Sequence, residues 1–281
     1  MLQARGLRFR HPGSPAPLFE RLDLAIEPGD CVGLIGPNGS GKTTLLRLLC
    51  GLLRPESGEV LLEGHPVRGM RPRERARILA LVPQESRLQF NFSLLEVVLM
   101  GRSPHLPRLA LERPEDHAAA RRALAAMDLA GLEERHLLDL SSGERQRALI
   151  ARALAQEPRA ILLDEPTAFL DLRHRLEIHD ILARLNRERG LTVVTVSHDL
   201  NLAARYAARL IVLDRGRIAA DGAPAAVLTP DLVRAVYETE AVVAPDPVTG
   251  APCVFPRAPA QGPGGGRPDL PGSFDSGPRL R

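Results

Sequence analysis

Apolar positions along the chain follow two spacings, and the alternation between these spacings predicts strands separated by helices. Segments that are apolar at every second position, or that form short apolar runs, predict strands at residues 2–9, 23–27, 31–35, 58–63, 79–82, 160–164, 191–197, 210–213 and 217–219. Segments with apolar residues three or four positions apart predict helices at residues 42–49, 72–78, 94–100, 114–127, 143–156 and 172–189. Strands that alternate with helices form a mostly parallel sheet covered on both faces, so the expected fold class is α/β.

The order of these elements also predicts the domain organisation. Between about residues 86 and 157 the pattern is helical only, which indicates a helical subdomain inserted into a single domain of residues 1–240. After that domain, two short strand patterns flank a turn at residues 246–250 and predict a small hairpin over residues 241–256. Residues 257–281 contain six glycines and five prolines with few apolar residues, so we expect this tail to be disordered.

Composition and charge exclude several classes of protein. With 44% hydrophobic and 25% charged residues, the 281-residue chain can bury a core, and its length corresponds to at most about two domains. The 37 basic and 34 acidic residues are interspersed, which argues against a nucleic-acid-binding stripe. No apolar run approaches the ~20 residues that span a bilayer, and we expect no export signal. Three cysteines without a C-x-x-C pair exclude a disulfide scaffold and a four-cysteine zinc site. This cysteine usage is typical of a reducing compartment.

One basic residue differs from all the others. Of the 37 basic side chains 36 are arginine, and the single lysine, Lys42, lies in a segment that fits the phosphate-loop pattern G-x-x-x-x-G-K-[ST]. In such a loop successive backbone N–H groups face one anion, the lysine reaches the β- and γ-phosphates, and the hydroxyl of Thr43 binds Mg²⁺. The alternative is a glycine-rich turn with an incidental lysine, which the strand before it and the helix after it disfavour. The residues expected to bind a nucleoside triphosphate are Gly36, Pro37, Asn38, Gly39, Ser40, Gly41, Lys42, Thr43 and Thr44.

Two adjacent acids end the apolar strand at residues 160–164. Because ligands bind at the carboxyl edge of an open parallel sheet, Asp164 is expected to hold Mg²⁺ through water and Glu165 to take a proton from an attacking water. The alternative is a solvated pair of acids. Gln84 and His198 follow two other predicted strands, where the amide could bind Mg²⁺ or the water and the imidazole could donate to the γ-phosphate. Taken alone, each of these two residues is more typical of a loop or a structural position, so their roles depend on the surrounding motifs.

The start of a helix at residues 140–144 is the element that identifies a family. Ser141 and Glu144 form an S-x-x-E capping box, and the N-terminus of such a helix can also bind an anion; a well-capped helix is the alternative. The sequence Leu140-Ser-Ser-Gly-Glu144 resembles the LSGGE signature of ATP-binding cassette (ABC) proteins. Over about residues 1–256 the motifs follow in the order typical of that family: the phosphate loop, Gln84, the signature, Asp164 and Glu165, Asp171 of the D-loop (residues 169–171) and His198.

This resemblance implies a P-loop NTPase core of the RecA-like type, with a mostly parallel sheet, an antiparallel β subdomain and an inserted helical subdomain. It also implies an ATP hydrolase that uses Mg²⁺ and works as a head-to-tail dimer. Each ATP would lie between the phosphate loop of one copy and the signature of the other. The implied catalytic residues are Glu165, His198 and Gln84, the implied metal-binding residues are Thr43, Gln84 and Asp164, and the nucleotide site is completed by Ser141, Ser142, Gly143, Glu144 and Asp171.

Two positions depart from the family pattern. Ser142 replaces the usual second glycine of the signature, and a residue this small should still let the backbone approach phosphate. Where the family usually has an aromatic residue that stacks on adenine, the sequence Phe9-Arg-His11-Pro-Gly13 makes His11 the expected stacking residue. The smaller imidazole ring predicts modest nucleotide affinity. The alternative is that His11 is only a surface loop residue.

Residues 84–105 resemble a segment of importer subunits for ferric siderophores, heme and vitamin B12, in which F-x-F-[ST]-x-x-E-V-V-x-x-G-R-x-P-H recurs. Generic residues of the helical subdomain are the alternative. The importer class implies a membrane permease and a substrate-binding protein as partners, no nucleic acid, and a peripheral position at the cytoplasmic face of the membrane. A DNA-repair ATPase would carry a long coiled coil and a translation factor would carry two cassettes, and the sequence has neither pattern. The cargo and the permease stay open.

Two groups of side chains around that segment invite functional hypotheses. Phe90 and Phe92 precede the predicted helix at 94–100 and are expected to contact the permease. The alternative is that they are buried inside the helical subdomain, which is favoured by the apolar stripe of Leu95 and Val98 on the helix that follows. Three histidines could suggest heme or metal ligands, but we expect scattered surface positions for His105, His174 and His179.

Overall fold

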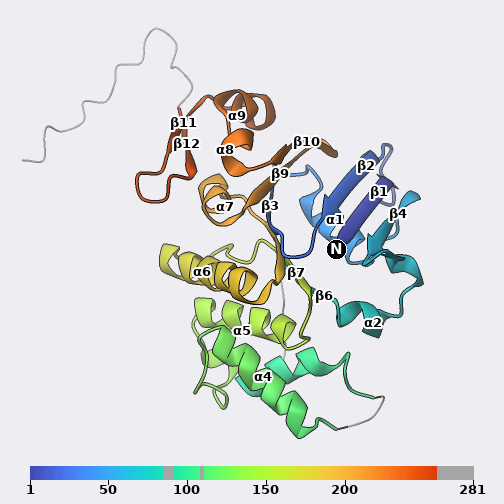
Figure 1. Ribbon diagram of the computed structural model, residues 1–281, viewed down its shortest axis with the longest axis vertical. Coiled ribbons are helices and arrows are strands. Elements are labelled where there is room, and N and C mark those ends of the chain that lie inside the picture. The colour runs from blue at the N-terminus through green and yellow to red at the C-terminus, as the bar shows by residue number, and fades with distance from the viewer. Residues whose placement is uncertain (85–90, 108–110, 258–281) are drawn as a thin grey trace, which may run out of the picture.

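A computed structural model describes residues 1–84, 91–107 and 111–257, and its centre is a six-stranded sheet (Figure 1). The strand order is β10-β9-β3-β8-β7-β6, in which β10 pairs antiparallel with β9 and all other pairs are parallel. The bounds are β3 (Cys31–Ile35), β6 (Leu79–Val82), β7 (Ala160–Asp164), β8 (Thr192–Val196), β9 (Arg209–Asp214) and β10 (Arg217–Gly222). The carboxyl ends of β3, β6, β7 and β8 therefore share one edge of the sheet. The phosphate loop, Gln84, Glu165 and His198 follow these four ends.

Helices cover both faces of this sheet because its strands are apolar on both sides. Alternate residues of a strand point to opposite faces. In β7, Leu162 packs in the cluster that contains α1 (Lys42–Leu49), whereas Ile161 packs in the cluster that contains α6 (Leu172–Arg189). A further helix, α7 (Leu200–Tyr206), contacts β3. The predicted α/β fold class with a mostly parallel sheet is confirmed.

A second, antiparallel sheet shares an apolar core with α1. Its strand order is β2-β1-β4-β5, and its strands are β1 (Leu2–Phe9), β2 (Phe19–Ile26), β4 (Ser57–Leu62) and β5 (His65–Pro66). The alternation at residues 23–27 predicted only the second half of β2, which begins at Phe19, a fully buried side chain. Between β5 and β6 the chain forms a 3₁₀ turn (Val67–Gly69) and α2 (Pro72–Ala76).

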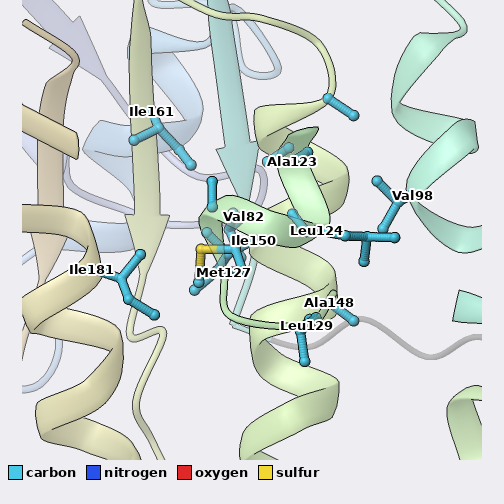
Figure 2. Packing of buried hydrophobic residues seen from close by; sticks show 14 of the residues in the cluster. Val82, Val98, Ala123, Leu124, Met127, Leu129, Ala148, Ile150, Ile161 and Ile181 are labelled. Atoms are coloured by element: carbon cyan, nitrogen blue, oxygen red, sulfur yellow. The ribbon is translucent and has the colours of Figure 1, made fainter. Parts of the chain in front are cut away.

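The helical stretch shares its core with the large sheet. It contains α3 (Leu94–Leu99), α4 (Pro114–Ala126) and α5 (Ser142–Leu154), with 3₁₀ turns at Met100–Arg102 and Leu137–Asp139. Val98 of α3, Leu124 of α4 and Ile150 of α5 pack in one cluster with Val82 of β6 and Ile161 of β7 (Figure 2). Because this core is continuous, the orientation of the three helices depends on the same strands that carry the predicted site.

The side chains around α3 lie mostly inside this core. Phe92 and Leu95 are half-buried against the cluster and Val98 is fully buried. This packing favours the alternative in which the segment belongs to the helical stretch itself; Phe90 lies outside the described residues.

A buried ion pair, which the sequence analysis did not predict, holds the segment that follows α3. Arg102 is 6% exposed, and its Nε donates to Asp116 Oδ1 at 3.0 Å. Its Nη1 donates to the carbonyl oxygen of Ala155 at 2.7 Å, so the arginine joins α4 to the end of α5. Removing one partner of such a buried pair typically costs about 3–5 kcal/mol. Part of the importer-like segment therefore stabilises the fold.

After β10 the chain forms two short helices and a hairpin. Their bounds are α8 (Pro224–Val227), α9 (Pro230–Tyr237), β11 (Ala241–Pro245) and β12 (Pro252–Pro256). Asn201 of α7 holds the hairpin, because its side chain donates to the carbonyl oxygen of Val254 at 3.2 Å and accepts from the Val254 N–H at 2.7 Å. The hairpin lies at the end of the molecule opposite α4 and α5 (Figure 1). None of the helices in the described ranges has both the length and the apolar character needed to pass through a bilayer.

Candidate active site

The phosphate loop joins β3 to α1, and two of its positions require glycine. Gly36 and Gly41 have φ angles of 146° and 107°, which residues with side chains rarely adopt. A Cβ atom on Gly36 would collide with the carbonyl oxygen of Leu213, and one on Gly41 would lie 2.8 Å from the ring of Phe19. Neighbouring strands therefore pack against the loop from outside and fix its curvature.

Lys42 is buried inside this loop, with its ammonium group on the loop's own carbonyl groups. Its Nζ donates to the carbonyl oxygens of Gly36 at 2.8 Å and Pro37 at 2.9 Å, and the residue is 5% exposed. Burial lowers the pKa of Lys42, and the two acids at the end of β7 oppose that effect. The hydroxyl of Ser40 is also buried, without a hydrogen-bond partner among the described residues. An anion in the loop would provide an acceptor for both groups.

Thr43 and Asp164 meet at the carboxyl edge of the sheet. Thr43 Oγ1 donates to Asp164 Oδ1 at 2.9 Å and so joins the start of α1 to the end of β7. Burial raises the pKa of Asp164, which the hydrogen bond from Thr43 counteracts. A bound cation would likewise favour the ionised carboxylate. These two oxygen donors fit Mg²⁺, which is commonly held by one or two protein ligands together with phosphate oxygens. In the described ranges no cluster of three or more His, Cys, Asp or Glu could hold a metal by itself.

Glu165 follows β7 directly and is held from two sides. Gln84 Nε2 donates to Glu165 Oε2 at 2.9 Å, and Nε2 of His198 forms a short hydrogen bond with Glu165 Oε1. The φ angle of Glu165 is 50°, a left-handed conformation that costs about 1–3 kcal/mol for a residue with a side chain. The structure thus brings together three residues that follow three different strands, and it keeps the carboxylate at the edge of the sheet.

The signature (residues 140–144) begins α5 and forms the predicted capping box. Ser141 Oγ accepts from the Glu144 N–H at 3.2 Å, and the Glu144 carboxylate accepts from the Ser141 N–H at 2.8 Å. Ser141 and Ser142 are exposed, whereas Gly143 is buried. Among the described residues the signature makes no hydrogen bond to the phosphate loop. The two predicted halves of the nucleotide site are therefore not joined within one chain.

His11 lies beside the start of α1. Its Nε2 is 3.2 Å from Thr44 Oγ1, and its ring meets the ring of Phe9 edge-on with the centroids 4.9 Å apart. The residue is exposed, so a planar group can approach it from solvent. Stacking of His11 on adenine stays a prediction.

The three histidines expected at the surface occupy different environments. His105 is half-buried, with Nε2 2.9 Å from the carbonyl oxygen of Gln156. His179 is 5% exposed and stacks on Tyr206 with the ring centroids 5.0 Å apart, so the predicted surface position is wrong for His179. Burial lowers the pKa of His179 to about 4. The signal for this burial was its spacing, three residues before the buried Leu182 on the same helix.

The sequence analysis also missed the role of His174. This residue lies beside Asp171, which caps α6 by accepting from the His174 N–H at 2.9 Å. The ring of His174 is only 23% exposed. A signal was available, because histidine three residues after a capping aspartate lies in the first turn of the helix, where its side chain can reach back to the cap.

Comparisons with known proteins show the family of this chain. A family model described as ABC transporter matches residues 19–168. The chain is 49% identical over 247 residues to the hemin import ATP-binding protein HmuV of Myxococcus xanthus, a match that covers 85% of this chain and 91% of that protein. It is 41% identical over 237 residues to the ferric enterobactin transport ATP-binding protein FepC of Escherichia coli, with 84% and 88% covered.

Solved structures point in the same direction. An ABC transporter assigned to the metal-chelate type, in an inward-facing conformation, superimposes with a TM-score of 0.80 at 30% identity, over 92% of this chain and 97% of that chain. A dimeric ATP-binding cassette in a post-hydrolysis state with ADP and Pi superimposes with a TM-score of 0.70 at 30% identity, over 79% and 98%. Together with the phosphate loop, the acid pair and the signature, these matches show that the chain belongs to the ABC transporter family.

Proposed function

We propose that this chain is the ATP-hydrolysing subunit of an ABC importer whose cargo is an iron chelate, heme or vitamin B12. Two observations support this cargo class. The relatives named above carry hemin and ferric enterobactin in their names, and they match this chain over more than four fifths of its length. Residues 84–105 also carry the importer-like segment. The cargo itself would pass through the permease, so this chain needs no site for it.

The working unit in this proposal is a head-to-tail pair of two copies. Each ATP is held between the phosphate loop of one copy, with Lys42, and the signature of the other copy, with Ser141 to Glu144. The exposure of Ser141 and Ser142 supports this arrangement, since neither residue has a hydrogen bond to the phosphate loop among the described residues. The similarity to a dimeric cassette supports it as well.

In the nucleotide-bound state Lys42 would exchange its two carbonyl acceptors for phosphate oxygens. That exchange is favourable because a buried ammonium gains more from an ionised acceptor than from a neutral one. Thr43 and Asp164 would hold Mg²⁺, which would supply positive charge at the β- and γ-phosphates where negative charge develops. The backbone N–H groups around Gly39 and Gly41, together with the orphaned hydroxyl of Ser40, would bind the remaining phosphate oxygens.

Hydrolysis in this proposal depends on Glu165. A water oxygen attacks the γ-phosphorus while one of its protons passes to the Glu165 carboxylate, and the bond from the γ-phosphorus to the oxygen of ADP breaks. The observation that carries this role is the position of Glu165 directly after Asp164, with Gln84 on one carboxylate oxygen and His198 on the other. These two contacts limit the rotation of the carboxylate and keep it aimed at the site.

The remaining partners follow from the importer class. Closure and opening of the dimer would drive a membrane permease, to which a substrate-binding protein delivers the cargo, and this subunit would lie peripherally at the cytoplasmic face of the membrane. Association with the permease would use the surface of the helical stretch. Phe92 is a poor candidate for that contact, because it is half-buried against the core.

The test of this function is Glu165→Gln, which removes the base and keeps the shape of the side chain. We expect the ATPase rate to fall by about 10²–10⁴-fold, while the variant binds ATP and accumulates as a dimer in size-exclusion chromatography with light scattering. The matched control is Glu188→Gln at an exposed position of α6, which should keep the wild-type rate. Hydrolysis at the wild-type rate by Glu165→Gln would remove this residue from the role.

The importer assignment is tested separately by isolating the chain from membranes of its own cells. A copurifying integral-membrane permease with its binding protein is the expected result. Copurification with DNA-repair or ribosomal proteins in place of a permease would refute the transport function and leave the ATPase chemistry intact.

A further inference from the structure

His174 connects two segments that lie far apart in the sequence, the D-loop and the signature. Its Nδ1 is 2.8 Å from Asp171 Oδ1, and the same carboxylate oxygen accepts from the His174 N–H at 2.9 Å. The other side of the imidazole ring covers Gly143 of the signature, where a Cβ atom would collide with ring atoms Cγ and Cδ2. Asp171 therefore fixes the ring from one side, and the ring fixes the backbone of Gly143 from the other.

A second contact holds the same two helices in register. Arg147, one turn into α5, donates to Glu177 of α6 at 2.6 Å, and Arg173 donates to the other oxygen of Glu177 at 2.8 Å. Both contacts lie within the first two turns of their helices, next to the signature and the D-loop. The start of α5 and the start of α6 are therefore linked twice.

The surface beside this link is suited to contact with another protein chain. Phe169 of the D-loop is 94% exposed, more than any other large hydrophobic side chain of the described residues, and Leu172, three residues later, is 67% exposed. Ser141 and Ser142 of the signature are exposed as well. The buried members of the group are Gly143 and, for the most part, His174, so the histidine lies beneath the surface that both segments present.

We propose that His174 is a positioning residue that makes the D-loop and the signature one rigid surface for the second copy of the chain. This inference rests on the head-to-tail dimer proposed above. In that dimer the signature binds the ATP of the partner, so its position relative to the D-loop decides whether both segments meet the partner together. His174 itself touches neither ATP nor the reacting atoms.

The role of His174 can be measured as ATP-driven dimerisation in the Glu165→Gln background, in which hydrolysis does not reverse the association. Adding His174→Ala removes both contacts of the ring. We expect dimerisation to weaken by about tenfold or more, on the scale of one hydrogen bond to a charged group, in sedimentation or light-scattering titrations. The affinity of the monomer for ATP, measured at low protein concentration with a fluorescent ATP analogue, should stay unchanged. In the monomer ATP is bound by Lys42 and the phosphate loop, which His174 does not contact.

Two conservative variants separate the contacts of the ring. His174→Asn keeps a polar atom near the position of Nδ1 for Asp171, and His174→Phe keeps a flat ring over Gly143. Each should recover part of the lost dimerisation. Glu188→Ala is the matched control, since it removes an exposed side chain at the far end of the same helix, and it should change dimerisation by less than about threefold.

A double-mutant cycle with Gly143→Ala tests whether the two residues act through each other. Because a Cβ on Gly143 collides with the imidazole, His174→Ala should cost less in the Gly143→Ala background than in the parent chain. Additive effects of the two substitutions would contradict a direct link between them.

Other outcomes overturn the inference in distinguishable ways. Unchanged dimerisation of the His174→Ala variant would show that the link is not needed. If the His174→Ala variant loses as much monomer ATP affinity as it loses dimerisation, or if its melting temperature falls markedly, His174 only stabilises the fold. If the Glu165→Gln parent binds ATP without forming a dimer, the proposed head-to-tail dimer fails first, and the role of His174 fails with it.

Discussion

His179 makes the stability of the fold sensitive to acid, and the size of the effect can be worked from its surroundings. The side chain is 5% exposed, stacks on Tyr206 and leaves its Nε2 without a hydrogen-bond partner in the described part of the chain. Burial lowers its pKa from 6.5 to about 4, because the protonated ring would lose its hydration; Asp199 and Asp180 oppose this only in part. The folded chain therefore keeps His179 neutral at pH values where the unfolded chain already protonates it.

This difference fixes the direction and the size of the pH dependence. Above pH 6.5 the ring is neutral in both the folded and the unfolded chain, so the titration of His179 does not reduce stability there. As the pH falls from 6.5 towards 4, the unfolded chain binds a proton that the folded chain does not, and the free energy of unfolding decreases. At about 1.4 kcal/mol for each pH unit between the two pKa values, the full loss is about 3 kcal/mol. By pH 5 about 2 kcal/mol of it should already be gone.

The variant His179→Phe keeps a stacked ring and removes the titration. In urea unfolding, the difference in free energy of unfolding between variant and wild type should shift in favour of the variant by about 2 kcal/mol from pH 7.5 to pH 5. Taking this difference cancels the other groups that titrate over the same range. His65→Phe, at an exposed position of β5, is the control and should show no such shift. A difference that does not depend on pH would refute the buried, neutral state of His179.

Two further predictions concern Lys42 and Phe92. Lys42→Arg should fold but lose most ATP binding in a nucleotide titration, because a guanidinium is too wide for a site only 5% exposed; Arg47→Lys, the reverse exchange at an exposed position of the same helix, should bind normally. Phe92→Asp should lower the free energy of unfolding by about 1–2 kcal/mol because Phe92 packs against the helical core, whereas Phe92→Leu should lower it less. Wild-type stability of Phe92→Asp would return this side chain to the candidates for permease contact.

The parts of the fold and the site that could be predicted well from the sequence are those encoded in short consecutive stretches of residues. The strands at residues 31–35, 79–82 and 160–164 have the predicted bounds, because a fully buried strand in a parallel sheet is a continuous apolar run. The phosphate loop is likewise encoded in eight consecutive residues with a lysine. Half-exposed strands were harder to predict. In the first half of β2 the alternation is interrupted, because the consecutive residues Glu20 and Arg21 are both exposed.

Contacts between distant residues could not be predicted from single positions. Thr43 and Asp164 are 121 residues apart, and Gln84 and Glu165 are 81 residues apart, so only the strand order shows that they meet. The buried pair of Arg102 and Asp116 was missed for a related reason. A charged residue in a predicted helical region is usually exposed, and nothing in the local sequence marks the exception.

The signature and its surroundings include residues that contacts within one chain do not explain. The capping box between Ser141 and Glu144 accounts for those two residues within the chain, since each hydrogen bond between them closes locally. It does not account for Phe169, an exposed aromatic residue on the neighbouring D-loop. That exposure is explained if the signature and the D-loop form a surface for a second copy, with His174 beneath it. Defects at His174 should accordingly appear in the association of two chains, whereas defects at Lys42 should appear already in one.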